Sequence, residues 1–345
     1  MGREVQAFEA DLASYLGVPV RQVACVSSGT AALHLAVQAV IEPGDEVLVQ
    51  SLTFVASLQA ISAAGAVPRL CEATTDTITI DLKDAERRIG PRTKAVMPVH
   101  YASNPGDLDG VYGFAARHGL RVIEDAAHAF GCTYRDRKIG SFGDIVCFSF
   151  DGIKNITSGE GGAVVSADPR VIELIRNSRL LGIHKDTDKR FTGQRSWDFD
   201  VERQGYRYHM SNLHAAIGRV QLVRLSEEFA LKRIRLAQRY RERLRGVASL
   251  ALLDTDLGAI VPHIQPVRVL GGQRDAVRTV LEAAGIQTGI HFQPGHLLSF
   301  FGGGEPDLPV TTQLYGELLT LPLHPQLSLE DVDHVCDVIS ECLGG

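Results

Sequence analysis

The sequence lacks long hydrophobic runs, paired cysteines and a secretion signal. No apolar stretch approaches the ~18 residues that a membrane-spanning helix needs, so no membrane partner is expected. Six cysteines are present, but none form a C-x-x-C pair, and no histidine stands beside them at zinc spacing. Several lie in short apolar runs, where a thiol packs as a small hydrophobe. Free thiols and a charged amphipathic N-terminus predict a cytoplasmic protein.

The common catalytic signatures are also missing. The chain has no G-x-S-x-G, no P-loop, no H-E-x-x-H and no G-x-G-x-x-G after its first predicted strand. These absences argue against the nucleophile, nucleotide and zinc sites that such motifs build. His291 and His296 are five residues apart around Pro294, a poor spacing for a metal, so no metal site is predicted.

The charge of the chain argues against nucleic acid as its main partner. The net charge is −6, and no helix-turn-helix pattern is evident. One stretch, Lys232–Arg245, is locally basic, and its apolar residues recur at helical spacing. This pattern favours the solvated face of an amphipathic helix. A binding site for a diphosphate or a nucleic acid is the alternative.

Apolar periodicity predicts an α/β fold of two domains. Over the first two thirds, short apolar runs alternate with helical stretches, which is typical of a mostly parallel sheet covered by helices. After about residue 235 a smaller α/β unit follows, with a strand near 259–269, a helix near 273–284 and a last helix from Ser328, which forms a capping box with Asp331. We expect a large domain at 1–235 and a small C-terminal domain at 236–345. The strands predicted in the large domain are 22–26, 46–50, 67–71, 95–99, 121–124, 145–150 and 163–166.

The segment Ser28-Gly29-Thr30 follows a predicted strand and opens a helix. A helix N-terminus offers unpaired N–H groups and a partial positive charge, so it can hold a phosphate. Gly29 would let the backbone approach a ligand closely. Serine is also a common N-cap, and that reading of Ser28 stays open.

Two further segments carry groups suited to catalysis. Asp125 ends the strand 121–124, where a carboxylate could pair with a protonated pyridine nitrogen; a helix cap is the alternative. Lys154 follows the apolar strand 145–150 and precedes a glycine-rich loop. A lysine beside a buried sheet must shift its pKa or find a partner. Desolvated lysines form Schiff bases with carbonyl compounds, although a purely structural lysine is the alternative. Ser149 could reach the same phosphate as Gly29.

Seven motifs in order resemble the DegT/DnrJ/StrS family of sugar aminotransferases, over nearly the whole chain. They are SSGTAAL at 27–33, LTFVAS at 52–57, EDAAHAFG at 124–131, FSFDGIKNITSGEGG at 148–162, GYRYHMSNLHAAIG at 205–218, GIHFQPGHLLSFF at 289–301 and LLTLPLHPQL at 318–327. The resemblance implies the fold-type I architecture of pyridoxal phosphate (PLP) enzymes, with PLP and its pyridoxamine form (PMP) as the cofactor.

The resemblance also implies a role for particular residues. Lys154 stands at the position of the Schiff-base lysine, and Asp125 at that of the partner of the pyridine nitrogen. Phe54 matches the aromatic residue that stacks on the cofactor ring, and His128 stands near the ring, where the family often has glutamine. Gly29, Thr30 and Ser149 match phosphate-binding positions. We expect Ser28, which precedes Gly29, to bind the cofactor as well.

Two further sets of positions concern the partner subunit and the substrate. Arg207 lies in the segment Gly205–Asn212, which resembles the piece that reaches the neighbouring subunit's active site, so a homodimer with shared sites is expected. The family commonly has asparagine at that position. On the substrate side, His291 and His296 lie in a segment that resembles a substrate loop, and His184 lies in the loop 182–192.

The predicted reaction moves an amino group from an amino acid, L-glutamate by resemblance, to a nucleotide-linked keto-deoxysugar. Two alternatives stay open. One is a PLP aminotransferase or lyase that acts on another compound, such as a cyclitol. The other is a non-catalytic regulator with the PLP fold, which a basic surface or an added DNA-binding module would favour.

Overall fold

The computed structural model describes residues 1–184, 200–302 and 307–344. Its largest element is a seven-stranded sheet of order β1-β9-β8-β5-β4-β2-β3. All neighbouring pairs from β8 to β3 are parallel, whereas β9 runs antiparallel to both β1 and β8. The strands are β1 (Val23–Val26), β2 (Glu46–Gln50), β3 (Val67–Cys71), β4 (Thr93–Met97), β5 (Arg121–Asp125), β8 (Ile145–Ser149) and β9 (Gly162–Ser166).

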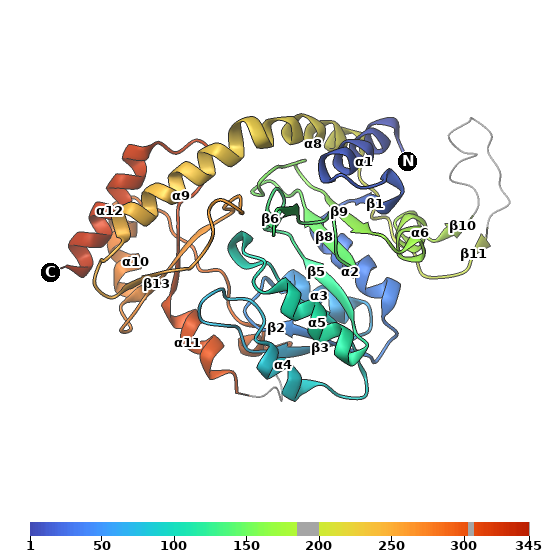
Figure 1. Cartoon of the computed structure of the whole chain (residues 1–345), viewed down its shortest axis with the longest axis horizontal. Coiled ribbons are helices and arrows are strands. Elements are labelled where there is room, and N and C mark those ends of the chain that lie inside the picture. The colour runs from blue at the N-terminus through green and yellow to red at the C-terminus, as the bar shows by residue number, and fades with distance from the viewer. Residues whose placement is uncertain (185–199, 303–306, 345) are drawn as a thin grey trace.

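Helices cover this sheet and bury its apolar strands, as Figure 1 shows. Every residue of β1, β2, β8 and β9 is buried, which is typical of a sheet covered on both faces. Acidic side chains begin three of the helices: Asp81, Asp107 and Asp168 accept backbone N–H groups of the first turns. The helices are α1 (Arg3–Leu16), α2 (Gly29–Val40), α3 (Val55–Ala63), α4 (Leu82–Arg88), α5 (Leu108–His118) and α6 (Pro169–Ser178).

One long helical rod leads from the large domain to the C-terminal part. It consists of α8 (Asn212–Arg224), a π-helical turn η3 (Leu225–Phe229) and α9 (Ala230–Leu244), and it crosses the top of Figure 1. In the C-terminal part, a three-stranded antiparallel sheet packs with helices. These elements are β12 (Leu250–Leu252), β13 (Gln265–Val269), α10 (Arg274–Ala283), α11 (Pro309–Glu317), β14 (Leu318–Leu321) and α12 (Leu329–Leu343).

Short elements complete the description. Two-residue strands form two antiparallel pairs. Among the described residues, three 3-10 turns connect larger elements. These elements are β6 (Thr133–Tyr134) with β7 (Arg137–Lys138), β10 (Ile183–His184) with β11 (Asp200–Val201), and the turns η1 (Val20–Gln22), η2 (Tyr101–Ser103) and η4 (Gly295–Leu297). Among the described residues, no helix is both long enough and apolar enough to cross a membrane.

The structure confirms the predicted α/β class with a mostly parallel sheet. It also confirms the capping box of Ser328 and Asp331. A separate apolar core is built by residues from Leu236 onward, whereas Leu308 packs into the core of the large domain. The domain boundary near residue 235 therefore stays a prediction.

One predicted strand was too long. Only Gln265–Val269 of the predicted 259–269 is a strand. The preceding residues, 259–264, which we call the crossing segment, run as irregular backbone over the large domain. Side chains of that domain form hydrogen bonds with the backbone of the crossing segment. For example, Asn155 donates to the carbonyl of Val261, and Ser103 accepts the N–H of His263. These backbone groups are therefore hydrogen-bonded without a neighbouring strand.

The basic stretch Lys232–Arg245 lies on an amphipathic helix, as the favoured interpretation predicted. Many of its charges are paired or buried rather than free for an anion. Arg239 and Arg243 form ion pairs with Asp333 of α12. Arg233 is buried and donates to backbone carbonyls, and burial lowers its pKa to about 10.

Candidate active site

The carboxyl ends of the sheet strands meet at a cavity of about 290 Å³. Ligand sites of open α/β sheets lie at this edge. Most of the predicted site residues line the cavity together, although they come from widely separated segments. They are Ser28, Gly29, Thr30, Phe54, Asp125, His128, Ser149, Lys154 and His291.

Lys154 lies in the turn after β8, where its backbone N–H donates to the carbonyl of Asp151 at 3.1 Å. Its side chain is half-buried. Burial lowers the pKa of the Lys154 amine, and this effect outweighs the attraction of Asp125 and Asp151, which raises it. Within the described residues, the amine has no hydrogen bond or ion pair. A lysine in this state is readily deprotonated and can act as a nucleophile or a base.

Asp125 presents a fixed carboxylate at the end of β5. The residue is 5% exposed, and its Oδ2 accepts a hydrogen bond from the Ser57 hydroxyl at 2.6 Å. Its Oδ1 accepts the backbone N–H of Ala127 at 3.2 Å. These contacts fix the orientation of the carboxylate beside the cavity, where it can bind the N–H of a cationic ring.

The N-terminus of α2 forms a close-fitting cradle at one side of the cavity. Ser28 is the N-cap, and its hydroxyl accepts the N–H of Ala31 at 3.1 Å. A Cβ added at Gly29 would lie 2.7 Å from the Cβ of Ser149, and one added at Gly162 would lie 2.4 Å from the Ser28 carbonyl oxygen. Only glycine therefore fits at these positions. The free N–H groups of this helix end suit a phosphate.

Two histidines in ring contact form part of the cavity wall. The rings of His128 and His263 lie 4.3 Å apart between centroids. Both are buried, and burial lowers the pKa of each far below the usual value, with further lowering by nearby cationic groups. Among the described residues, Nδ1 of each ring has no hydrogen-bond partner. Each ring is therefore neutral and offers one nitrogen to a ligand.

His291 contributes to the wall from the C-terminal part of the chain. Its Nδ1 lies 2.9 Å from the hydroxyl of Thr320, and its carbonyl accepts the hydroxyl of Tyr101 at 2.7 Å. Burial lowers its pKa, and Lys154 lowers it further. The structure thus places a neutral His291 ring at the cavity, and its role in substrate binding stays a prediction.

Phe54 stands at the mouth of the cavity. Its ring is 55% exposed and lies 5.5 Å from that of Phe292 between centroids, at 50°. Much of the Phe54 ring is therefore free to cover a planar ligand. Thr30 is also exposed, at the first turn of α2.

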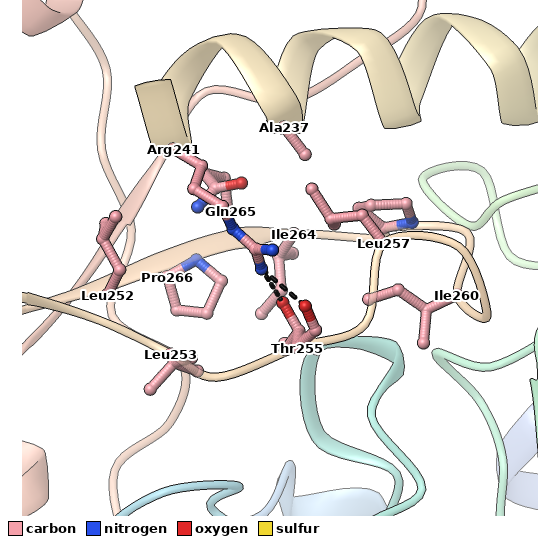
Figure 2. A pocket seen from close by; sticks show the side chains of 12 residues that line it. Ala237, Arg241, Leu252, Leu253, Thr255, Leu257, Ile260, Ile264, Gln265 and Pro266 are labelled. Atoms are coloured by element: carbon pink, nitrogen blue, oxygen red, sulfur yellow. Dashed lines mark hydrogen bonds between the residues drawn. The ribbon is translucent and has the colours of Figure 1, made fainter. Parts of the chain in front are cut away.

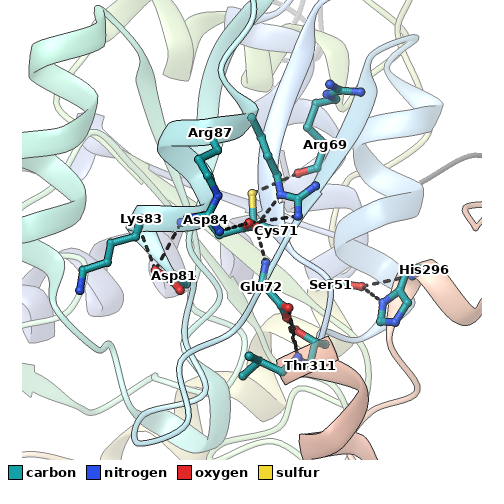
Figure 3. Close-up of polar contacts among 12 residues, drawn as sticks. Ser51, Arg69, Cys71, Glu72, Asp81, Lys83, Asp84, Arg87, His296 and Thr311 are labelled. Carbon is teal, nitrogen blue, oxygen red and sulfur yellow. Dashed lines mark hydrogen bonds and ion pairs between the residues drawn. The ribbon is translucent and has the colours of Figure 1, made fainter. Parts of the chain in front are cut away.

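Two predicted residues, His296 and Arg207, do not line the cavity, and the side chain of His184 lies outside the described residues. Both ring nitrogens of His296 are engaged: Nδ1 lies 2.8 Å from Ser51 Oγ and Nε2 2.9 Å from Thr312 Oγ1. Figure 3 shows the contact with Ser51. The His296 ring therefore connects Ser51, which follows β2, with Thr312 of α11. This geometry gives no argument for a substrate role.

The second of these residues is Arg207. Arg207 is exposed and pairs through its backbone with Leu180. His184 ends the short strand β10, and the rest of its predicted loop, 185–199, lies outside the described residues.

The sequence analysis missed other groups that line the cavity, chiefly His100 and His263. His100 is fully buried, and its Nε2 lies 3.1 Å from Oε2 of Glu124. It follows the predicted strand 95–99, so the rule that ligands bind at strand ends could have found it. His263 lay within the strand that was predicted too long, and no local signal marked it.

A second hollow lies between α9 and the crossing segment, and Figure 2 shows it from close by. Its volume is about 30 Å³, which is room for about one water molecule. Arg241 reaches the carbonyl of Thr255 there at 2.6 Å. This hollow is too small for a cofactor, so the larger cavity is the candidate site.

The residues of the larger cavity fit pyridoxal phosphate. The glycine-lined end of α2 matches a phosphate, the fixed carboxylate of Asp125 a pyridine nitrogen, and the Lys154 amine an aldehyde. Phe54 can cover the ring. A mostly parallel sheet with this site at its carboxyl edge defines the protein as an enzyme of the pyridoxal phosphate class.

Comparison with known proteins identifies the family. The model of the DegT/DnrJ/EryC1/StrS aminotransferase family matches residues 1–340. The spore coat polysaccharide biosynthesis protein SpsC of Bacillus subtilis is 37% identical over 355 residues, which cover 100% of this chain and 90% of that protein. The chain belongs to the DegT/DnrJ/EryC1/StrS aminotransferase family.

Solved structures agree in fold. The sugar aminotransferase CalS13 from Micromonospora echinospora is 30% identical, with a TM-score of 0.90, and the match covers 99% of this chain and 92% of that one. Spr1654 from Streptococcus pneumoniae, in its PLP form, is 28% identical, with a TM-score of 0.90 and coverage of 100% and 92%. The predicted family, fold class, cofactor and enzyme class are confirmed: this is a PLP-dependent sugar aminotransferase.

Proposed function

We propose that the protein transfers an amino group from L-glutamate to a nucleotide-linked keto-deoxysugar. The observation that carries this proposal is the pairing of a deprotonatable lysine with a fixed carboxylate in one cavity. When bound, the cofactor supplies an electron sink for the carbon that loses its proton. The chain's own groups would do the rest: Lys154 would hold the cofactor and then move the proton as base and acid, and Asp125 would keep the ring nitrogen cationic.

The cavity is poor in positive charge for such substrates. Among the described residues that line it, Lys154 is the only lysine or arginine, and Asp125, Asp151 and Glu160 add negative charge. A donor carboxylate and a sugar-linked diphosphate need further cations. We infer that Arg207 of a second copy supplies one of them, so the complete site belongs to a homodimer.

An exposed apolar stripe on α8 supports the dimer. Leu213, Ile217, Val220 and Val223 recur at helical spacing and are 79%, 46%, 62% and 65% exposed. Such a stripe marks an interaction surface. The stripe begins near the glycine-rich loop that follows Lys154. The His214 ring, one residue after Leu213, would lie 3.7 Å from a Cβ added at Gly159 of that loop. A second copy seated on α8 would therefore stand next to the cavity.

Charging this stripe tests the dimer. We expect Val220→Glu with Val223→Glu to give monomers by light scattering and to lower transamination strongly, because each cavity loses its neighbour. Val280→Glu, a change at an exposed valine of α10 in the C-terminal part, should leave both properties as they are. Mixing inactive Lys154→Met chains with inactive Arg207→Met chains should restore part of the activity. No recovery from stable mixed dimers would contradict the shared site.

The reaction itself is tested by two successive measurements. The visible absorption band of the lysine-bound cofactor should disappear when L-glutamate is added. It should return with a nucleotide-linked 4-keto or 3-keto-6-deoxyhexose. Return with a keto-cyclitol instead would replace the sugar by a cyclitol, and a band that ignores every amino donor would contradict transamination.

The polysaccharide context of the relative SpsC and the sugar aminotransferase CalS13 support a sugar acceptor. The six free cysteines, most of them buried, support a reducing compartment such as the cytoplasm.

A further inference from the structure

We propose that Asn155 and Ser103 are positioning residues that hold the Lys154 turn and the His128 turn against the crossing segment, residues 259–264. The inference rests on the proposed role of Lys154 as the base. Asn155 and Ser103 would fix the position of the Lys154 amine, and the crossing segment would be part of the framework that holds it.

Asn155 follows Lys154 directly and is not among the described residues that line the cavity. It is 4% exposed, and its Nδ2 donates to two carbonyl oxygens at 3.0 Å each, those of Phe130 and Val261. Phe130 lies two residues after His128, and Val261 lies in the crossing segment. The amide therefore joins three chain segments at a point one residue from the reacting amine.

Ser103 joins two of these segments, the His128 turn and the crossing segment. Its Oγ lies 2.6 Å from the carbonyl oxygen of His128 and 2.8 Å from that of Val261, and it accepts the N–H of His263 at 3.0 Å. The Val261 carbonyl is thus shared by Asn155 and Ser103. The contacts also fix the backbones that carry the adjacent rings of His128 and His263.

The crossing segment is itself held from the C-terminal side. Nη1 of the buried Arg233 donates to the carbonyls of Pro262, at 3.2 Å, and His263, at 3.0 Å. The segment then continues into β13. The crossing segment therefore connects the C-terminal sheet to the Lys154 turn through buried hydrogen bonds, and removing one donor costs at least one buried carbonyl a hydrogen bond.

A small shift of a base lowers the rate of proton transfer far more than it lowers binding, and a displacement of about 1 Å can cost 10²-fold. Loss of the Asn155 or Ser103 contacts should therefore slow the step in which Lys154 moves a proton. Covalent binding of the cofactor needs only that the amine reach the aldehyde, so it should persist. A residue that served folding alone would change both together.

The experiment compares Asn155→Ala and Ser103→Ala in the PLP-loaded dimer. We expect exchange of the α-proton of L-glutamate with deuterium, followed by NMR, to fall by about tenfold or more. The visible band of the lysine-bound cofactor and the KM for L-glutamate should change little. Asn155→Asp keeps the size but loses the amide donor, so it should not rescue exchange.

Asn104→Ala is the matched control. Asn104 lies in the same turn, but its side chain contacts Gly106 and Asp254 rather than Val261 or His128, so exchange should stay near the parent rate. Exchange within twofold of the parent in both test variants would overturn the proposal, as would loss of the band in proportion to exchange. A parent enzyme that exchanges no proton would refute the proposed function instead.

Discussion

Replacing Lys154 by methionine should abolish transamination while leaving the fold intact. Methionine keeps a similar length and volume but cannot form a bond to the cofactor or move a proton. Loss of positioned proton transfer alone lowers a rate by about 10²- to 10⁴-fold, and loss of the covalent attachment adds to this. PLP should still bind through the α2 cradle and Asp125, but without the visible band of the lysine-bound form. Turnover near the parent value would refute the assignment.

The same substitution should stabilise the cofactor-free protein at neutral pH. The folded chain lowers the pKa of Lys154 below its usual value of 10.5, chiefly by burial. Between the two pKa values the unfolded chain therefore binds more protons, so the stability contribution of this lysine is poorest at low pH and improves as pH rises. Methionine removes the cost of burying the charge.

Thermal unfolding across pH checks this sign. We expect the apo Lys154→Met variant to melt above the parent near pH 7, with a gap that narrows as pH approaches the usual lysine pKa. Lys138→Met is the comparison, since the Lys138 ammonium donates to the carbonyl of Tyr15 and lies over its ring; losing those contacts should lower the melting temperature. A Lys154→Met gap that widens with pH would contradict the assigned pKa shift.

The positions of Lys154 and Asp125 could be predicted because both follow continuous apolar runs. Such runs form parallel strands, and parallel strands bring their carboxyl ends to one edge. β5 and β8 are direct neighbours, with Asp125 opposite Cys147, so two segments far apart in the sequence meet at one cavity. Periodicity was enough to bring these two residues to one edge of the sheet, whereas their roles came from the family resemblance.

The crossing segment shows where such reasoning fails. Its apolar residues resemble a strand, but its backbone groups bind Ser103 and Asn155, which lie far away in the sequence. A tertiary contact of this kind leaves no periodic signal, so His263 could not be placed beside His128. His296 was predicted on the substrate side from the family resemblance alone, and nothing in the sequence indicated that Ser51 and Thr312 would contact both of its ring nitrogens.

Asp125→Asn should lower the rate of proton transfer while the cofactor remains covalently bound. Asparagine is nearly the same size, and Ser57 can accept a hydrogen bond where it now donates one. The amide, however, cannot hold the ring nitrogen in its cationic form. A charge-assisted hydrogen bond is worth about 1.5–3 kcal/mol, so exchange of the L-glutamate α-proton should fall by roughly 10- to 100-fold.

Asp151→Asn is the control that separates the effect of Asp125 on the ring nitrogen from the effect of the cavity's net negative charge. Asp151 also lines the cavity and also attracts Lys154, but it follows β8, and its Oδ1 accepts the N–H of Ile153 at 3.2 Å. If the carboxylate at β5 acts on the ring nitrogen, Asp125→Asn must slow exchange far more than Asp151→Asn does. Equal effects would mean that the cavity needs only its net negative charge, because both variants remove one carboxylate and both leave Lys154 in place.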